Sequence, residues 1–326
     1  MDKQALLTLL RQGGYVSGEE MGRLLGVSRA AVSKAVAGLK KEGYRLESAP
    51  NRGYRLTGEP DLLTKERILL HLGDHPWKER LHVLPVVDST NNYLKNLAAE
   101  GAPHGTVAVA DCQTGGRGRM GRSFDSAAGS GVYLSVLLRP ACPPTELMTL
   151  TAQTAVAAAR AVESVCGVQT GIKWVNDLVL SGRKICGILT ELSLEAESGL
   201  VSSAVVGVGV NCNRPETDFP PELRGTAGSI LSGTGRRVDR SLLAAQMIRE
   251  LSLMPEPDWL EAYRARCVTL GRQVQLLSPG RPPIQATALD VGEAAELLVR
   301  LEDGSVQAVN AGEVSVRGLY GYVQTP

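Results

Sequence analysis

Apolar residues recur at helical spacing three times in the first 43 positions of the chain. The three apolar sets, each followed by a glycine, are Leu6, Leu9 and Leu10; Met21, Leu24 and Leu25; and Val32, Val36 and Leu39. Ser17 and Ser28 stand before the second and third sets, where a serine can cap the start of a helix. Gly26 can take the positive φ that ends a helix. Two helices joined by a three-residue turn are the helix-turn-helix plan.

A hairpin pattern follows these helices. Short strand-like runs at Tyr44–Glu47 and Tyr54–Leu56 flank Pro50-Asn51-Arg52-Gly53, and Asn and Gly favour a tight turn. We expect this hairpin to be a wing, and we predict that residues 1–62 form a winged helix-turn-helix DNA-binding domain. The segment Thr57–Thr64 predicts a linker, after which a helical pattern resumes at Lys65–Leu72.

Strand-like apolar runs outnumber helical patterns in the middle of the chain. The predicted strands are Val83–Val87, Thr106–Ala110, Val132–Leu138, Gly171–Trp174, Ile185–Leu192 and Val201–Val210. One Ala-rich stretch, Pro144–Val165, predicts a helix. The spacings are typical of an antiparallel or mixed sheet, so we expect residues 63–270 to form a mixed-sheet domain of the α+β class, not a doubly wound fold.

The last part of the chain consists of short alternating strands. They are predicted at Gln273–Leu277, Ile284–Leu289, Glu296–Leu301, Val306–Val309 and Val314–Gly318. Pro279-Gly280 and Asp303-Gly304 are turn signals between them. We expect residues 271–326 to form a small β-barrel of SH3-like size.

Charge is distributed unevenly along the 326 residues. The net charge is +1, but residues 1–60 hold ten of the 35 Lys and Arg and six of the 34 Asp and Glu. A basic N-terminal region on a neutral body predicts that this region alone meets a polyanion. The predicted DNA-binding residues, on the third helix and the wing, are Ser28, Arg29, Ser33, Lys34, Arg52 and Arg55. The alternative is a three-helix packing module whose charges are only solvated.

The composition argues against several other classes of protein. Hydrophobic residues make up 43% of the chain and charged residues 21%, and no apolar run approaches the roughly 20 residues of a transmembrane helix. The first residues lead into an amphipathic pattern without a cleavable signal, so we expect a cytoplasmic protein with no membrane partner. The six cysteines contain no CxxC pair and the four histidines no HExxH motif, so we predict no metal-ligating residues.

The most informative stretch is Gln113-Thr114-Gly115-Gly116-Arg117-Gly118-Arg119-Met120-Gly121-Arg122. Its four glycines permit close backbone approach and positive φ, and its three guanidinium groups suit carboxylates and phosphates. A Rossmann loop would open a helix, and a Walker loop would contain Gly-Lys-Ser/Thr; neither applies here. We expect this arginine loop to be mobile until an anion orders it. An exposed nucleic-acid-binding loop is the alternative.

Five motifs together resemble the biotin–protein ligases, in the order and at the separations usual for that family. They are Asp88-Ser89-Thr90-Asn91, the arginine loop, Lys173-Trp174-Val175-Asn176-Asp177, Gly182-Arg183-Lys184-Ile185-Cys186-Gly187-Ile188-Leu189 and Gly207-Val208-Gly209-Val210-Asn211. With its N-terminal region, the chain resembles the family of bifunctional biotin ligases and biotin operon repressors over its whole length. Phe124 stands where the family often has Trp, and Val175 where it often has Pro.

The resemblance implies two half-reactions. The biotin carboxylate attacks the α-phosphate of ATP to give biotinyl-adenylate and pyrophosphate, and a lysine amine of a biotin carboxyl carrier domain then displaces AMP. The first step joins two anions, so preorganised cations are required. The resemblance implies Arg119 and Lys184 as catalytic cations, and Asp177 as an orienting group or base beside the incoming lysine. Mg²⁺ is expected to bridge the ATP phosphates with few protein ligands.

The same resemblance implies two sets of contact residues. Biotin is expected to contact Ser89, Thr90, Asn91, Gln113, Gly115, Gly116, Arg117, Gly118, Arg119, Lys184 and Gly187. The nucleotide is expected to contact Arg117, Arg119, Arg122, Phe124, Lys173, Asn176, Lys184 and Asn211. Ser89, Thr90 and Gln113 are neutral donors and acceptors that suit the ureido ring of biotin, which needs matched hydrogen bonds when buried. The ring of Phe124 can stack on adenine.

The resemblance also implies partners. The adenylate is expected to favour a homodimer whose two N-terminal domains bind operator DNA, and the acceptor is expected to be the carrier protein of acetyl-CoA carboxylase or another biotin-dependent carboxylase. Glu313 and Arg317 either touch the ATP site or form a surface pair. Two alternatives are a ligand-sensing transcription factor without ligase activity and a transferase of lipoate or octanoate.

Overall fold

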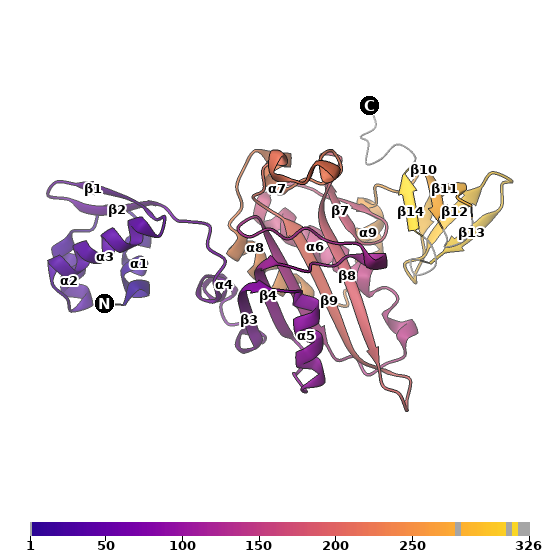
Figure 1. Cartoon of the computed structure of the whole chain (residues 1–326), viewed down its shortest axis with the longest axis horizontal. Helices are drawn as coiled ribbons and strands as arrows, with labels where there is room; N and C mark the ends of the chain where they lie inside the picture. Colours follow the sequence, from indigo (N-terminus) through magenta and orange to yellow (C-terminus); the bar gives the residue numbers. More distant parts are fainter. Residues whose placement is uncertain (1, 278–281, 311–314, 319–326) are drawn as a thin grey trace. The chain divides into compact units, whose positions relative to one another are not determined.

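The chain folds into two compact units, Met1–Leu62 and Leu63–Pro326. The computed structural model describes residues 2–277, 282–310 and 315–318 (Figure 1). Each unit has its own hydrophobic core, so each is described here by itself.

The first unit is a winged helix-turn-helix, as predicted. Its elements are α1 (Lys3–Arg11), α2 (Gly18–Leu25), α3 (Arg29–Lys41) and the antiparallel strands β1 (Arg45–Ala49) and β2 (Gly53–Gly58) (Figure 1). Ser17 and Ser28 cap α2 and α3, because their hydroxyls accept the backbone N–H groups of Glu20 and Ala31. Gly26 ends α2 with a φ of 68°.

One apolar position of α2 does not face the core. Met21 is fully buried, but Leu24 is 52% exposed, which contradicts the predicted apolar face. The turn explains the difference, since Gly22 lies so close to it that a Cβ would stand 2.7 Å from the Val27 carbonyl oxygen. The helix therefore meets the turn along the Met21–Gly22 side, and Leu24 lies on its outer side.

The wing is fastened to the segment that precedes α2. Val16 and Tyr54 exchange two backbone hydrogen bonds of 2.9 Å. Gly53 permits this contact, because its φ is +100° and a Cβ there would lie 2.0 Å from the Val16 carbonyl oxygen. Asn51 also has a positive φ, so the predicted turn residues do make the turn.

The second unit contains a seven-stranded mixed sheet, as predicted, with the order β3-β4-β5-β9-β8-β7-β6. Its strands are β3 (Leu81–Val87), β4 (Thr106–Gln113), β5 (Gly131–Leu138), β6 (Gly171–Lys173), β7 (Asp177–Leu180), β8 (Arg183–Leu194) and β9 (Val201–Asn211). Only the pair of β3 and β4 is parallel among these neighbours. The α+β class is therefore confirmed.

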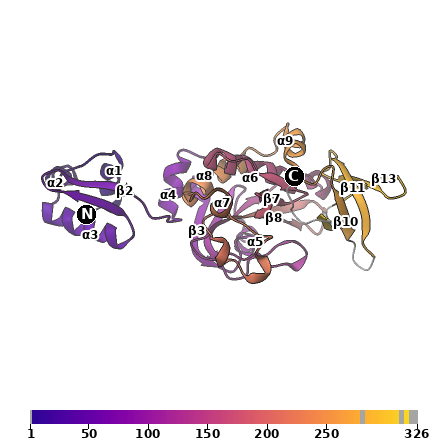
Figure 2. The same cartoon turned by 90° about the horizontal axis from the view of Figure 1, so that it is seen from above.

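Helices cover both faces of this sheet. They are α4 (Lys65–Leu72), α5 (Thr90–Ala99), α6 (Leu150–Cys166), α7 (Ile230–Thr234), α8 (Arg240–Ser252) and α9 (Trp259–Arg266). Short 3₁₀ turns occupy Lys78–Arg80, Arg119–Gly121, Pro144–Leu147, Glu216–Asp218 and Pro221–Leu223. In Figure 2, α6 and α8 lie on one side of the sheet and α5 on the other, where α5 packs on β4, β5 and β9.

The second unit also differs from the predicted pattern. The predicted helix Pro144–Val165 is a 3₁₀ turn followed by α6, and α5 was not expected. The sequence of α5, TNNYLKNLAA, has a weak signal because Asn is a poor helix former and only Leu94 and Ala98 are its buried apolar residues. The strand β7 was missed because Asp177 breaks the apolar run.

The C-terminal strands form a five-stranded antiparallel sheet with the order β13-β12-β11-β10-β14. The strands are β10 (Gln273–Leu277), β11 (Ile284–Val291), β12 (Leu297–Leu301), β13 (Val306–Val309) and β14 (Ser315–Gly318). All five predicted strands are confirmed, while closure into an SH3-like barrel stays a prediction. The predicted turn Pro279-Gly280, Glu313 and the side chain of Arg317 lie outside the described residues.

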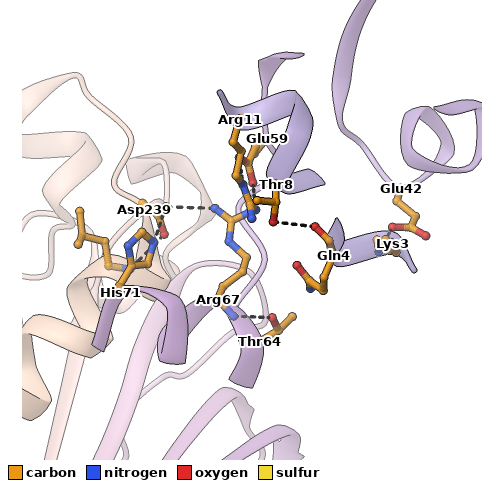
Figure 3. Close-up of polar contacts among 11 residues, drawn as sticks. Lys3, Gln4, Thr8, Arg11, Glu42, Glu59, Thr64, Arg67, His71 and Asp239 are labelled. Carbon is orange, nitrogen blue, oxygen red and sulfur yellow. Dashed lines mark hydrogen bonds and ion pairs between the residues drawn. The ribbon is translucent and has the colours of Figure 1, made fainter. Parts of the chain in front are cut away.

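Ion pairs reinforce both units separately (Figure 3). In the first unit, the Arg11 guanidinium meets both carboxylate oxygens of Glu59 at 2.8 and 2.7 Å. In the second unit, Arg67 and His71 of α4 point at Asp239, and the Arg67 Nη2 lies 3.1 Å from its carboxylate. Asp239 also caps α8, so this carboxylate joins the ends of two helices. None of the helices in the described ranges has the length and apolarity needed to cross a bilayer.

Two glycines of the first unit allow a matched test. We expect Gly53→Ala to destabilise this unit by about 1–3 kcal/mol, because alanine resists the positive φ and its Cβ would collide with Val16. Gly38→Ala in α3 should instead stabilise it by about 0.5–1 kcal/mol, because Gly38 has a helical backbone and no neighbour within 4 Å of an added Cβ. Native-state hydrogen exchange of the α1–α3 amides in the full chain measures both. Equal shifts of the same sign would contradict the prediction.

Candidate active site

A cavity of about 150 Å³ lies in the second unit, between the arginine loop and strands β7, β8 and β9. Most of the site residues predicted from sequence line it: Ser89, Thr90, Asn91, Gln113, Arg117, Gly118, Arg119, Arg122, Phe124, Lys173, Asn176, Asp177, Lys184 and Gly187. Four separate segments of the sequence therefore meet around one cavity. Its two walls differ in chemistry.

The first wall is neutral and polar. Ser89, Thr90 and Asn91 begin α5 and are only 3–4% exposed. The Gln113 Oε1 accepts the Thr90 N–H at 2.9 Å, and its Nε2 donates to the Ser126 hydroxyl at 2.9 Å. Both ends of the Gln113 amide are thus held by protein groups, which makes the wall a preorganised set of donors and acceptors.

The second wall is cationic. The described lining holds five basic side chains, Arg117, Arg119, Arg122, Lys173 and Lys184, and one acidic side chain, Asp177. The Lys184 Nζ lies 2.6 Å from the Asp177 carboxylate. Burial lowers the pKa of Arg119 and the Asp177 carboxylate counteracts it, but a guanidinium keeps its charge at neutral pH. An excess of positive charge in a partly buried site favours anionic ligands.

Backbone hydrogen bonds shape the arginine loop into a small hairpin. The Gly118 N–H donates to the Arg122 carbonyl at 2.7 Å, and the Phe124 N–H donates to the Gly116 carbonyl at 2.9 Å. Of the four glycines only Gly116 is required by close packing, since a Cβ there would lie 2.3 Å from the Phe124 carbonyl oxygen. Positive φ occurs at Gly121 and also at Met120, which the sequence did not predict.

The arginines of this loop point in different directions. Arg117 donates to the Glu191 carboxylate at 2.9 Å and to the Asn92 Oδ1 at 2.6 Å. Arg119 donates to the Asn176 Oδ1 at 2.9 Å, and the Asn176 Nδ2 donates to the carbonyl of Ile188 on β8. These partners reduce the expected repulsion among the loop cations. That the loop is mobile without a ligand stays a prediction.

Glycines of β8 and β9 form the floor under Phe124. A Cβ on Gly209 would lie 2.6 Å from the Phe124 ring, and one on Gly187 would lie 3.2 Å from it. The Lys184 Nζ is 6.0 Å from the ring centroid, and the Tyr133 ring centroid is 6.4 Å from it. The two glycines therefore make room for the Phe124 ring itself, which lies directly against the strands.

Three predicted contact residues do not line the cavity. Gly115 donates its N–H to the Asp88 carbonyl at 2.8 Å, and Gly116 packs against Phe124. Asn211 is 6% exposed and its Nδ2 donates to the Gly228 carbonyl at 2.9 Å. Trp174 does line the cavity, but it is only 5% exposed and its indole N–H donates to the Ala295 carbonyl, as in a packed core residue.

Sequence reasoning missed several lining residues. Tyr133 lies opposite Gly209 in the register of β5 and β9, and Met120, Ser123, Ile188, Leu189 and Val208 also line the cavity. Only strand pairing brings Tyr133 here, and pairing is not visible in one sequence. Among the described residues, no group of three or more His, Cys, Asp and Glu side chains could hold a metal ion.

The first unit carries a second candidate surface. Arg29, Ser33 and Lys34 are exposed on α3, while Ser28 uses its hydroxyl to cap that helix. The two arginines of the wing differ. Arg52 is exposed and its guanidinium lies 4.4 Å from the Tyr15 ring centroid. Arg55 also lies over Tyr15, but it forms an ion pair of 2.7 Å with Glu47. Hydrogen bonds from Arg55 and Tyr15 lower the pKa of Glu47, so it stays ionised.

Comparison with known proteins follows the same division of the chain. Residues 83–211 match the Biotin/lipoate A/B protein ligase family, residues 2–55 an HTH domain, and residues 269–317 the biotin protein ligase C terminal domain. The bifunctional ligase/repressor BirA of Bacillus subtilis is 40% identical over 241 residues, which are 73% of this chain and 74% of that protein. The chain belongs to the biotin–protein ligase family.

Two further relatives of this biotin–protein ligase extend the match. The bifunctional ligase/repressor BirA of Escherichia coli is 32% identical over 319 residues, 96% of each chain. The biotin protein ligase from Aquifex aeolicus in complex with biotin and ATP has a TM-score of 0.62 at 29% identity, and covers 73% of this chain and 98% of that one. The E. coli match includes the winged helix-turn-helix as well as the mixed sheet.

Proposed function

We propose that this chain is an ATP-dependent biotin–protein ligase that also represses transcription. One observation carries the ligase half: a single cavity brings a neutral wall of amide-type donors and acceptors against a wall of five cations. The neutral wall suits the ureido ring of biotin, and the cations suit its carboxylate together with a nucleotide. The family relatives named for biotin, and the structure that contains biotin and ATP, support these substrates.

In the first half-reaction, a biotin carboxylate oxygen forms a bond to the α-phosphorus while the bond from that phosphorus to pyrophosphate breaks. Both reactants are anions, so their approach is unfavourable in water. Arg119 and Lys184 supply fixed positive charge at the point of contact, and neither has to be recruited during the reaction. Phe124, above the glycine floor, is our candidate for stacking on adenine.

In the second half-reaction, a lysine amine attacks the acyl carbon, the acyl–oxygen bond breaks and AMP leaves. The amine must lose a proton, and Asp177 is the one carboxylate in the described lining. We assign it the role of orienting this amine or accepting its proton. Mg²⁺ would bind together with ATP and neutralise part of the charge of its phosphates. Asp177 is engaged by Lys184, so the described lining offers that ion few free oxygen ligands.

The proposal extends to partners and location. The acceptor would be a biotin carboxyl carrier protein, of acetyl-CoA carboxylase or another carboxylase, and the protein would act in the cytoplasm. The adenylate would favour a homodimer that binds operator DNA through α3 and the wing, since two-fold pairs of such helices read two half-sites. The chain would divide into DNA-binding (1–62), catalytic (63–270) and C-terminal (271–326) domains.

Arg119→Ala should nearly abolish adenylate formation. Loss of one preorganised donor costs about 3–4 kcal/mol of barrier, or roughly 10²–10³-fold in rate. Biotin-dependent exchange of pyrophosphate into ATP measures this step alone. Arg160→Ala is the control, because Arg160 pairs with Glu256 and Asp258 outside the cavity and should leave exchange unchanged. Exchange with lipoate but not with biotin would instead favour a lipoate-type enzyme.

Asp177→Asn should slow the transfer step by about 10²-fold, because the amide cannot accept the amine proton. The measurement is single-turnover transfer from preformed biotinyl-adenylate to a carrier domain, so that the first half-reaction does not contribute. A variant that transfers biotin at the wild-type rate would remove Asp177 from this role.

DNA binding should depend on Arg52 more than on Arg55. Binding of an operator fragment, measured as a function of salt concentration, should lose about one unit of slope with Arg52→Ala. Arg55→Ala should lose less, because Glu47 already neutralises Arg55. Glu47→Gln should increase affinity by freeing that charge. Equal loss of slope with the two arginine variants would show that Arg55 leaves Glu47 to bind phosphate.

A further inference from the structure

One carboxylate beside the cavity is shared by two cations from different segments of the chain. Glu191 on β8 is half-buried and is not among the residues that line the cavity. Its Oε1 lies 2.8 Å from the Nζ of Lys95, on α5, and 2.9 Å from the Nη2 of Arg117, in the arginine loop. Two cations at one oxygen repel one another, so each of them weakens the hold of the carboxylate on the other.

The two cations differ in what else they face. Arg117 lines the cavity, and its side chain is 41% exposed. Lys95 does not line the cavity, and among the described residues Glu191 is the one acceptor that its Nζ contacts. Arg117 can therefore exchange Glu191 for an anion in the cavity, whereas Lys95 stays with Glu191.

Arg117 is held at one nitrogen of its guanidinium group. Its Nη2 lies 2.6 Å from the Asn92 Oδ1 and 2.9 and 3.0 Å from the two carboxylate oxygens of Glu191. Asn92 is neutral, so the charge of Glu191 determines how firmly the guanidinium is held. The other N–H groups of this guanidinium have no protein acceptor among the described residues, which leaves them for an anionic ligand.

Lys95 does more than Arg117 to keep Glu191 ionised. Burial raises the pKa of Glu191, but hydrogen bonds from Lys95 and Asn91 and the charges of Lys95 and Arg117 together lower that pKa below its ordinary value. The charge of Arg117 is the smallest of these effects. When Arg117 turns away, Lys95 therefore remains to balance a carboxylate that would otherwise be left half-buried without a cation.

We infer that Lys95 is a positioning residue, which balances the charge of Glu191 and thereby lets Arg117 turn from Glu191 to an anion in the cavity. This inference rests on the proposed function, because it takes the biotin carboxylate or the ATP phosphates as that anion. Lys95 itself touches neither the ligand nor the reacting atoms. Without Lys95, Arg117 would be the only cation paired with Glu191 among the described residues, and its move to a ligand would leave a half-buried charge unbalanced.

Lys95→Met tests this role with an unbranched side chain that has no charge. We expect a rise of about fivefold, the effect of one partly exposed ion pair, in the dissociation constant for biotin or in the KM for ATP. Calorimetry on the full chain measures the first constant and pyrophosphate exchange the second. A rise for biotin assigns Arg117 to the carboxylate, and a rise for ATP assigns it to the phosphates. The methyl ester of biotin has no carboxylate, so its binding should change by less than twofold.

A second substitution separates the effect of charge from an effect of shape. Glu191→Gln removes the charge that holds Arg117, so in this background Lys95→Met should change either constant by less than twofold. Lys95→Arg keeps the cation and should bind both ligands as the wild-type protein does. If Lys95→Met has the same effect in both backgrounds, or if Lys95→Arg shares that effect, charge balance at Glu191 is not the cause and the inference is wrong.

Lys78→Met is a matched control. The Lys78 side chain is 38% exposed against 32% for Lys95, pairs with Asp74 at 2.7 Å, and lies outside the cavity lining. This substitution should leave both constants within twofold. Wild-type protein that forms biotinyl-adenylate while Lys95→Met leaves both constants unchanged would overturn this inference alone. Wild-type protein that binds no biotin would overturn the proposed function.

Discussion

The repulsion between two negatively charged reactants is the constraint on which this site depends. A carboxylate and a triphosphate do not approach one another unless positive charge is already in place. Here that charge comes from three separate sources, the arginine loop, the end of β6 and the start of β8, and the cavity lies where they meet. Arg119 and Lys184 contact Asn176, in the β6–β7 turn, and Asp177, the first residue of β7, respectively. The sheet edge thus supports the cationic wall.

The cations of this wall repel one another when no anionic ligand is bound. Carboxylates of the protein offset this repulsion. Asp177 pairs with Lys184, and Glu191 pairs with Arg117 and Lys95. In our account Asp177 has a second role, toward the amine of the acceptor lysine.

Much of the molecule could be predicted from sequence, and the exceptions have physical reasons. The helix caps at Ser17 and Ser28 and the five C-terminal strands were predictable because local chemistry and period-two alternation determine them. The helix α5 was not, because its polar residues serve the cavity and hide its periodicity. The family motifs predicted that Gly116 and Asn211 contact a ligand. In the structure Gly116 instead packs against Phe124, and Asn211 donates to the Gly228 carbonyl. Tyr133 was missed because strand pairing alone brings it to the site.

The central claim is that the cavity joins a carboxylate to the α-phosphorus of ATP. The most direct measurement is mass spectrometry of the products when the purified chain is given ATP, a carrier domain and biotin labelled with ¹⁸O in its carboxyl group. The account predicts biotinyl-adenylate as an intermediate and one heavy oxygen in the AMP released, because the attacking oxygen stays on phosphorus when the acyl bond breaks. Biotinylated carrier together with unlabelled AMP, or no mixed anhydride at all, would contradict it.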